Sequence, residues 1–342
     1  SPEKLNINFL NGGSGGSNWL HFNSIQINPV LDQIVISSRN LSEIYIIDHS
    51  TTTAEAASNS GGLYGKGGDF LYRWGNPQSY NQGTEADRKL YGQHYAHVIA
   101  PGLLDENKII LFNNGNGRDP DFSEVYILNP ETDSPGVYSY LPDTAYGPAA
   151  PDYIYEDPTA PTDFYSHILS SAQRLPNGNT LICAGFNARF FEITPSEKIV
   201  WEYVSPVNSA NGSAAAQGDD PTSFPNATFR AIKYGTDYAA FIGKDLTPSD
   251  PIELNPDLTA CNNLSLSEFE ESTISLYPNP TKAKIRINSI RNLDKIEVYN
   301  VLGRKISETQ SSIVDLSGQT NGIYFLRIYS ESIIISKKVI KN

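Results

Sequence analysis

Short hydrophobic runs, many of them alternating with polar residues, follow one another through residues 1–250 and are separated by Gly, Asn, Asp and Pro. Runs of this length rich in β-branched and aromatic residues predict β-strands, and the polar clusters between them predict turns. We expect the clearest strands at residues 33–37, 43–48, 108–112, 124–128, 179–183, 189–193 and 199–203. The pattern therefore predicts an all-β fold.

The order of these strands repeats along the chain. A strand that ends near a turn is followed by one that starts with Glu, and then by an aromatic strand that contains Trp. Residues 70–74 and 199–203 take the same place in two such units. This rhythm is typical of the four-stranded blades of a β-propeller, which we assign to residues 1–245. A two-sheet sandwich is the alternative that the pattern leaves open.

A second domain is indicated by a change in composition after the propeller. Residues 246–273 are rich in Pro, Asp, Asn, Ser and Thr, and we interpret them as a linker. Short alternating strands return at residues 284–287, 295–299 and 323–328, and the chain ends in a basic stretch. We expect residues 274–342 to form a small β-sandwich.

Composition and charge limit the classes of partner and cofactor that we expect for this protein. The 342 residues carry a formal net charge of -13, which disfavours binding to nucleic acid. No apolar run is long enough to span a bilayer. The two cysteines, Cys183 and Cys261, are far apart, so the sequence fits a disulfide and two free thiols equally well. The closely spaced ligands of a zinc site are missing, and we expect no cofactor.

The motifs of residues 274–342 are specific. Tyr277-Pro278-Asn279-Pro280 opens the segment, and residues 298–303, 315–317, 321–324 and 337–341 continue it in a fixed order. This order resembles the C-terminal sorting domain of type IX secretion substrates. The resemblance implies a β-sandwich that interacts with the type IX secretion machinery and directs export, via the periplasm, to the surface or exterior of a Gram-negative cell. From the strands alone, a carbohydrate-binding or adhesive module is equally compatible.

The candidate chemistry lies in three segments. His21 and Asn23 form a His-x-Asn pair, Arg39 follows His21 by 18 residues after Ser-Ser, and His94 lies in a Gln-His pair. Together with Phe-Asn-Asn-Gly-x-Gly-Arg at 112–118, these segments are similar to the bacterial arylsulfotransferases, and the similarity extends over most of residues 17–255. The resemblance implies a six-bladed propeller that moves a sulfuryl group from an aryl sulfate donor to a phenol acceptor without a nucleotide sulfate. It also implies that His94 is the nucleophile.

These residue types suit the reaction. Sulfuryl transfer, like phosphoryl transfer, spreads charge over three equatorial oxygens, so positioned donors carry most of the catalysis. Arg39 offers a planar fork of donors, and His21 and Asn23 each offer a single one. A neutral imidazole at His94 can attack sulfur and form a covalent sulfohistidine.

We place several other polar residues outside the catalytic set. We leave His97 out, since local bulging decides which face of its strand it occupies, and we treat His167 as a residue at the rim of the pocket. Asn113, Asn114 and Arg118 are interpreted as turn residues, because Asn-Gly favours a tight hairpin. His49 is interpreted as a loop residue. Taken one at a time, each candidate is also compatible with a structural role in a strand or an ion pair.

Two alternatives to the transferase remain. One is a surface propeller that binds sulfated or anionic glycans without turnover, and the other is an aryl sulfate hydrolase. The arylsulfotransferases also have an active-site histidine upstream of the His-x-Asn pair, whereas residues 1–20 contain none. We therefore expect the sequence to be part of a longer gene product, because an open propeller would expose unpaired edge strands.

Overall fold

The computed structural model describes residues 1–9, 16–259, 274–289, 293–301, 304–330 and 333–342. Two compact units divide the chain, Ser1–Pro256 and Asp257–Asn342. The later part of the predicted linker, residues 260–273, lies outside the described residues, so the boundaries 1–245, 246–273 and 274–342 stay a prediction. Among the described residues, no helix has the length and apolar character needed to cross a membrane.

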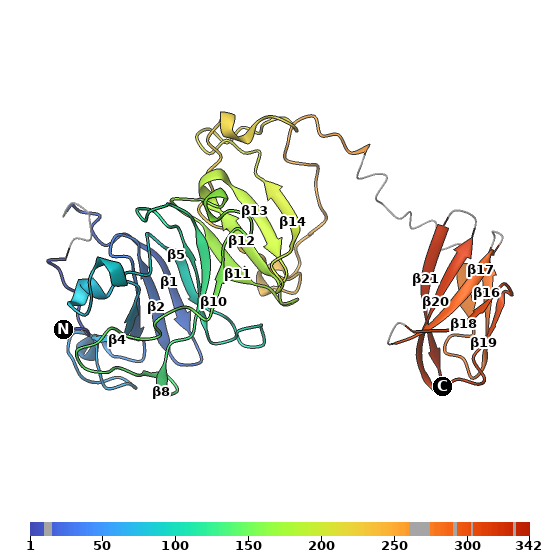
Figure 1. Cartoon of the computed structure of the whole chain (residues 1–342), viewed down its shortest axis with the longest axis horizontal. Coiled ribbons are helices and arrows are strands. Elements are labelled where there is room, and N and C mark those ends of the chain that lie inside the picture. Colours follow the sequence, from blue (N-terminus) through green and yellow to red (C-terminus); the bar gives the residue numbers. More distant parts are fainter. Residues whose placement is uncertain (10–15, 260–273, 290–292, 302–303, 331–332) are drawn as a thin grey trace. The chain divides into compact units, whose positions relative to one another are not determined.

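The first unit contains three antiparallel sheets, each built from four strands (Figure 1). Within each sheet the strands lie side by side in chain order. The first comprises β1 (Phe22–Asn28), β2 (Gln33–Ser38), β3 (Glu43–Asp48) and β4 (Phe70–Trp74). The second comprises β5 (His94–Val98), β6 (Ile109–Asn113), β7 (Glu124–Leu128) and β10 (Tyr153–Tyr155), and the third β11 (Ser171–Arg174), β12 (Thr180–Ala184), β13 (Arg189–Ile193) and β14 (Ile199–Val204).

This arrangement confirms the all-β prediction and the strand rhythm. The aromatic strands β4 and β14 are both the fourth strand of their sheet, as the sequence pattern indicated. Helix is confined, in the described residues, to α1 (Thr53–Ala56) and a few short 3-10 turns. A small hairpin of β8 (Thr132–Ser134) and β9 (Val137–Tyr138) lies in the connection from β7 to β10.

The three sheets pack on two hydrophobic cores. Ile109 and Leu111 of β6 belong to the core shared with the first sheet, and Ile110 and Phe112 belong to the core shared with the third. Because alternate side chains of a strand point to opposite faces, a sheet covered on both sides needs a continuous hydrophobic strand, which β6 provides. The two outer sheets instead keep exposed apolar side chains, among them those of Ile25, Ile27, Val200 and Trp201.

The first and third sheets each contain an ion pair between their third and fourth strands, and the acidic and basic residues have exchanged places between the two sheets. Glu43 opens β3 and pairs with Arg73 of β4 at 2.6 Å, and neither side chain is exposed. In the third sheet, Arg189 opens β13 and pairs with Glu202 of β14, also at 2.6 Å. Arg73 and Glu202 occupy the same register position. Equivalent positions thus carry the same interaction with the acid and the base exchanged.

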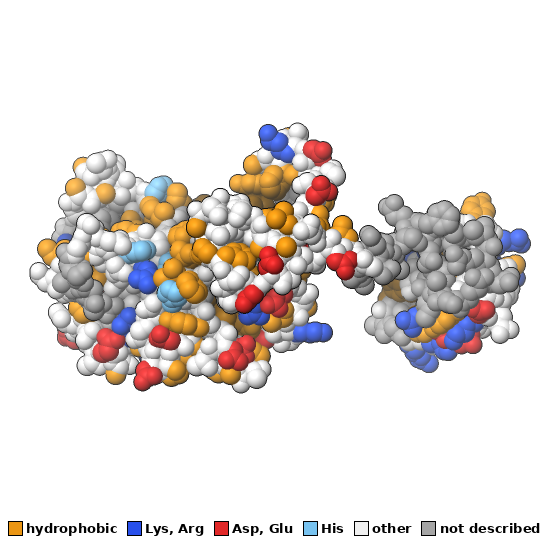
Figure 2. All heavy atoms as spheres, turned by 90° about the horizontal axis from the view of Figure 1, so that it is seen from above, with side chains coloured by type: hydrophobic (Ala, Val, Ile, Leu, Met, Phe, Trp, Pro, Cys, Tyr) orange, Lys and Arg blue, Asp and Glu red, His pale blue; other side chains and the backbone are white. Residues whose placement is uncertain are grey.

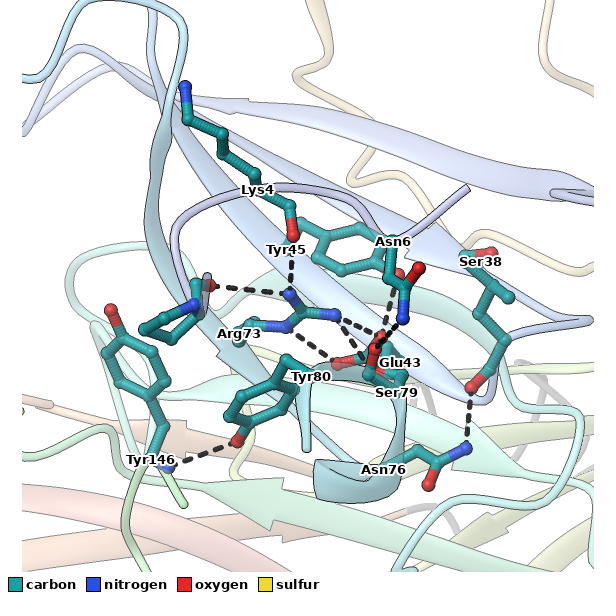
Figure 3. Close-up of polar contacts among 12 residues, drawn as sticks. Lys4, Asn6, Ser38, Glu43, Tyr45, Arg73, Asn76, Ser79, Tyr80 and Tyr146 are labelled. Atoms are coloured by element: carbon teal, nitrogen blue, oxygen red, sulfur yellow. Dashed lines mark hydrogen bonds and ion pairs between the residues drawn. The ribbon is translucent and has the colours of Figure 1, made fainter. Parts of the chain in front are cut away.

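The buried pair of the first sheet also holds the start of the chain (Figure 3). Arg73 donates through Nη1 to the backbone oxygens of Pro2 and Lys4 and through Nη2 to Ser79 Oγ. Burial raises the pKa of Glu43, and the guanidinium of Arg73 opposes that rise. Breaking one partner of a buried, hydrogen-bonded ion pair leaves an uncompensated charge, so this network depends on both members.

The first and second sheets are joined through side chains. Ser24 Oγ of β1 donates to the backbone oxygen of Ala96 at 3.4 Å, and Gln26 Oε1 accepts from the backbone N–H of Val98 at 2.6 Å. The side chains of β1 thereby satisfy backbone groups of β5 that would otherwise lie at an open strand edge.

The same linkage recurs on the third sheet. Ser171 Oγ of β11 donates to the backbone oxygen of Ala231 at 3.2 Å. Gln173 Oε1 accepts from the backbone N–H of Lys233 at 2.8 Å. Both linkages use a Ser-x-Gln sequence in the first strand of a sheet. The segment 228–234 therefore lies against the third sheet as β5 lies against the first.

The second unit contains two antiparallel sheets. One has the order β15 (Ile274–Tyr277), β16 (Lys284–Ser289), β19 (Ile313–Asp315), and the other β18 (Lys305–Thr309), β17 (Lys295–Asn300), β20 (Gly322–Ser330), β21 (Ile333–Lys341). Buried side chains from both sheets, such as Ile285, Val314, Val298 and Leu326, form one core. Two sheets facing a common core is the arrangement of a β-sandwich.

Candidate functional site

Three histidines lie where the chain enters the first strand of each sheet. His21 precedes β1, His94 begins β5 and His167 precedes β11, and each follows the previous one by 73 residues. Figure 2 shows histidine side chains gathered on one face of the first unit, beside a cationic side chain and among hydrophobic groups. The repeat of the fold therefore places one imidazole per sheet at the same end of the strands.

His94 is almost fully buried and neutral. Its Nδ1 lies 2.8 Å from Asn114 Oδ1 and 3.1 Å from the backbone oxygen of Gly92. Burial, the main cause, lowers its pKa to about 4; the charge of Arg39 and the ring of His21 act in the same direction, and the bonds to Asn114 and Gly92 oppose them. Within the described residues, Nε2 makes no hydrogen bond and is not among the buried unpartnered atoms. This nitrogen therefore reaches solvent.

His21 lies next to His94, with ring centroids 6.4 Å apart and ring planes at 76°. Its φ of 43° turns the backbone sharply just before β1, and its backbone oxygen accepts from the N–H of Arg39. Asn18 Nδ2 lies 2.8 Å from His21 Nδ1. An amide NH₂ can only donate, so the neutral His21 ring carries its proton on Nε2. Burial lowers the pKa of His21, and Arg39 adds to this effect.

Arg39 supplies the positive charge of the site. It follows β2, and a Cβ added to Gly92 would lie 3.9 Å from its Nε, so the guanidinium stem runs beside the segment that leads into His94. Nη1 donates to Asn40 Oδ1, and no carboxylate of the described residues forms an ion pair with Arg39. Burial lowers its pKa from the ordinary value for arginine, yet a guanidinium stays charged at neutral pH.

Asn23 lies beside the segment that leads into His94. Its Nδ2 donates to the backbone oxygen of Gln93 at 2.7 Å, and its Oδ1 is buried without a partner among the described residues. Gln93 in turn donates through Nε2 to Ser37 Oγ and to the backbone oxygens of Ser38 and Glu43. Asn23 and Gln93 therefore fix the start of β5, and hence His94, against the first sheet.

A β-bulge decides the position of His97. The pairing of β5 with β6 shifts between His94 and His97, where Tyr95 has a φ of 55°. His94 then faces Phe112 and His97 faces Ile110, so both histidines stand on the same face of the sheet. His97 is buried, its Nδ1 bonds to the backbone oxygen of Tyr95, and burial lowers its pKa to about 4.

The structure places Asn114 differently from the tight turn that the sequence predicted. Asn113 and Asn114 are fully buried, and the connection from β6 to β7 runs over residues 114–123, so the tight Asn-Gly hairpin that we expected is wrong. Gly115 is still required, because its φ is 76° and a Cβ there would lie 1.6 Å from the oxygen of Phe122. Arg118 forms an ion pair with Glu124 at 2.6 Å.

His167 and its neighbours form an aromatic border. The His167 ring is 4.2 Å from Phe186 and 6.1 Å from Tyr165, centroid to centroid. Phe229 stands edge-on to His94 with centroids 6.5 Å apart. Sequence reasoning left His167 at the rim and missed Asn114; the constant 73-residue spacing would have pointed to His167 as an equivalent of His94.

His49, as expected, lies just after β3 and pairs with Asp32. Cys183 is a buried free thiol, and Cys261 lies outside the described residues.

Comparison with protein families accounts for both units. A family model described as arylsulfotransferase (ASST) matches residues 4–217, which is more than half of the chain. The chain belongs to the arylsulfotransferase family. A second family model, described as a secretion system C-terminal sorting domain, matches residues 275–342. No protein in the curated set matches the chain.

These matches confirm the two resemblances predicted from the motifs. The arylsulfotransferase domain supports sulfuryl transfer at the level of the family and contains His21, Asn23, Arg39 and His94. Phe229 lies beyond the matched residues. The type IX sorting tail indicates handling by that secretion system and a secreted or cell-surface protein.

Proposed function

We propose that this arylsulfotransferase family member transfers a sulfuryl group from an aryl sulfate to a phenol through a sulfohistidine at His94. The observation that carries the proposal is a buried, neutral His94 whose pKa is lowered in part by the nearby charge of Arg39, a cation with no carboxylate partner among the described residues. A cation without a counter-ion beside a solvent-accessible imidazole nitrogen suits an anionic ester that the imidazole attacks.

In the first step, the Nε2 lone pair of His94 forms a bond to sulfur while the bond from sulfur to the aryl oxygen breaks. The electron pair of that bond leaves with the phenolate. Arg39 and the Nε2–H of His21 donate to the sulfuryl oxygens, where charge builds up in the transition state. In the second step a phenolate acceptor attacks sulfur, and the bond to Nε2 breaks to restore neutral His94.

The low basicity of His94 serves both steps. With a pKa of about 4, the ring is unprotonated at neutral pH and available for attack. A weakly basic nitrogen is also a good leaving group, so the sulfuryl group passes on readily to the acceptor. Burial, the main cause of the low pKa, therefore favours transfer over accumulation of the intermediate.

Asn23 has a supporting part in this proposal. Because one of its N–H groups is bonded to the backbone oxygen of Gln93, it acts mainly by holding the start of β5 against the first sheet. The catalytic set of His94, His21 and Arg39 then stays aligned as the donor binds. No cofactor takes part in these steps.

Intact mass spectrometry tests the proposal directly. After incubation with nitrophenyl sulfate, the wild-type protein should carry a sulfuryl adduct, and a phenol acceptor should speed donor cleavage and discharge the adduct. His94→Asn should give no adduct and lose about 10³-fold or more in turnover. His49→Asn, at an exposed histidine in a loop, is the matched control. A rate of donor cleavage that does not change when the acceptor is added would indicate a hydrolase. The absence of any cleavage would favour the alternative of a protein that binds anionic glycans without turnover.

We propose further that the three sheets are successive blades of a six-bladed β-propeller. The recurrence of the Ser-x-Gln linkage at Ser24 and Ser171 supports this, because each first strand meets the next unit in the same way. On this proposal, segment 228–234 is the inner strand of a fourth blade. An oxidised Gln173→Cys, Lys233→Cys double variant should cross-link, whereas failure to cross-link would contradict that placement.

For the second unit, we propose that residues 274–342 are a separate sorting domain behind a linker at 246–273. Its type IX signal would take the protein through the periplasm of a Gram-negative bacterium to the surface or the medium. The family match of residues 275–342 supports this route.

A further inference from the structure

The side-chain amide of Asn114 has a fixed orientation. Its Nδ2 donates to the backbone oxygen of Ser166 at 2.6 Å and to that of Leu169 at 3.0 Å. A carbonyl oxygen cannot donate, so both amide hydrogens are used on these two acceptors. The amide oxygen is therefore the end that faces the ring of His94.

This orientation determines which ring nitrogen of His94 carries the proton. Asn114 Oδ1, 2.8 Å from Nδ1, can only accept a hydrogen bond, and so can the backbone oxygen of Gly92 at 3.1 Å. The neutral ring therefore carries its hydrogen on Nδ1, and the lone pair is on Nε2. Nε2 is also the nitrogen that reaches solvent.

The amide is held in place by the third sheet. Ser166 and Leu169 lie in the connection that leads into β11, where Leu169 has a φ of 60° and Ser170 a φ of 91°. The backbone N–H of Ser166 donates to Ser123 Oγ, and that of Ser170 donates to the backbone oxygen of Phe229. Because these bonds fix the two carbonyls, the amide of Asn114 cannot rotate without leaving buried groups unpaired.

We propose that Asn114 is a positioning residue that selects the Nδ1–H tautomer of His94 and stabilises the ring as it takes up the sulfuryl group. The second part of this inference rests on the proposed function. When Nε2 bonds to sulfur and the aryl oxygen leaves with its electron pair, the imidazole keeps its Nδ1 proton and becomes positively charged. The hydrogen bond from Nδ1 to Asn114 Oδ1 then becomes charge-assisted, so it is stronger in the transition state than in the resting protein.

Nitrogen NMR of the resting protein tests the tautomer without any substrate. In ¹⁵N-labelled protein the His94 ring, assigned by the signals lost in His94→Asn, should show a protonated Nδ1 and a bare Nε2 at neutral pH. In Asn114→Ala the Nε2–H form should become populated. A wild-type ring protonated on Nε2 would overturn the inference.

Kinetics of two variants test the catalytic part. Asn114→Ala should lower kcat about 10- to 100-fold while KM changes little, because the lost bond strengthens only in the transition state. Asn114→Asp keeps an acceptor but adds a negative charge, so it should raise the pKa of His94 and move the acid limb of the kcat/KM profile upward by about a pH unit or more. Asn116→Ala, in the same connection but with a weaker bond to the His167 backbone, is the matched control.

The outcomes separate the two proposals. An Asn114→Ala protein that melts like wild type but keeps its kcat and pH profile would overturn the positioning role. A wild-type protein that forms no adduct from nitrophenyl sulfate would remove the proposed function, while the tautomer measurement would still decide whether Asn114 selects the ring form. If Asn114→Asp fails to fold, the NMR experiment on wild type still tests the selection.

Discussion

Lowering the pH from 7 to 5 should destabilise the first unit through two buried histidines. His94 and His97 each have a pKa of about 4 in the folded protein, against an ordinary value of 6.5. As the pH falls below 6.5, the unfolded chain binds protons at both positions, whereas the folded protein does so only near pH 4. Stability is therefore lost as the pH falls through this window.

The size of the effect follows from the two pKa values. At pH 5 each histidine costs about 2 kcal/mol relative to pH 7, and the pair costs about 4 kcal/mol. Domains of this kind are stable by about 5–15 kcal/mol, so the loss is large enough to measure. Carboxylates with a lowered pKa, such as Asp105 and Glu192, lose their contribution mainly below pH 5. His21, whose pKa is also lowered, adds a loss of the same sign.

Urea unfolding followed by tryptophan fluorescence measures this loss in the full chain. All three tryptophans, Trp19, Trp74 and Trp201, lie in the first unit, so the signal reports on that unit alone. His97→Gln should remove about half of the pH dependence. Equal stability of the wild type at pH 7 and 5 would refute the reasoning, as would an unchanged slope in His97→Gln.

Three further predictions concern other parts of the structure. Arg39→Lys keeps the charge but loses the planar fork of donors, so kcat/KM for nitrophenyl sulfate should fall about 10- to 100-fold; an unchanged value would remove Arg39 from the site. Glu43→Gln leaves Arg73 buried without its counter-charge, so urea unfolding should show a loss of about 3–5 kcal/mol, and a loss below about 1 kcal/mol would contradict the buried pair. Deleting residues 274–342 should leave the first unit folded but retained in the periplasm, and normal surface display would contradict the sorting assignment.

The sequence was most informative for features that depend on residues close together in the chain, such as the strands. The continuous hydrophobic run of β6 follows from a sheet that is covered on both faces, so this strand could be predicted from pattern alone. In β1 the pattern misleads, because Ile25 and Ile27 are exposed whereas Ser24 and Asn28 are buried. The equivalent places of β4 and β14 were also predicted from the pattern. The family motifs likewise placed His21, Arg39 and His94 together.

The missed features depend on long-range contacts. Asn114 looked like a turn residue because the sequence shows only the following glycine, whereas its partners lie 20 residues away in His94 and 52 residues away in Ser166. The face occupied by His97 depends on one bulge at Tyr95, which no alternation of residues reveals. The role of Asn23 depends on the carbonyl of Gln93, whose position is set by packing between two sheets.

The order of strands within each sheet has a consequence for engineering. Because each sheet presents its first strand to the site, its fourth strand (β4, β10 or β14) forms the opposite edge. The connection from β5 to β6, at the other end of β5 from His94, carries Gly102 in open space. Peptides inserted there would extend the molecule without touching the imidazoles, so this loop is a suitable position for displaying foreign sequences on an exported protein.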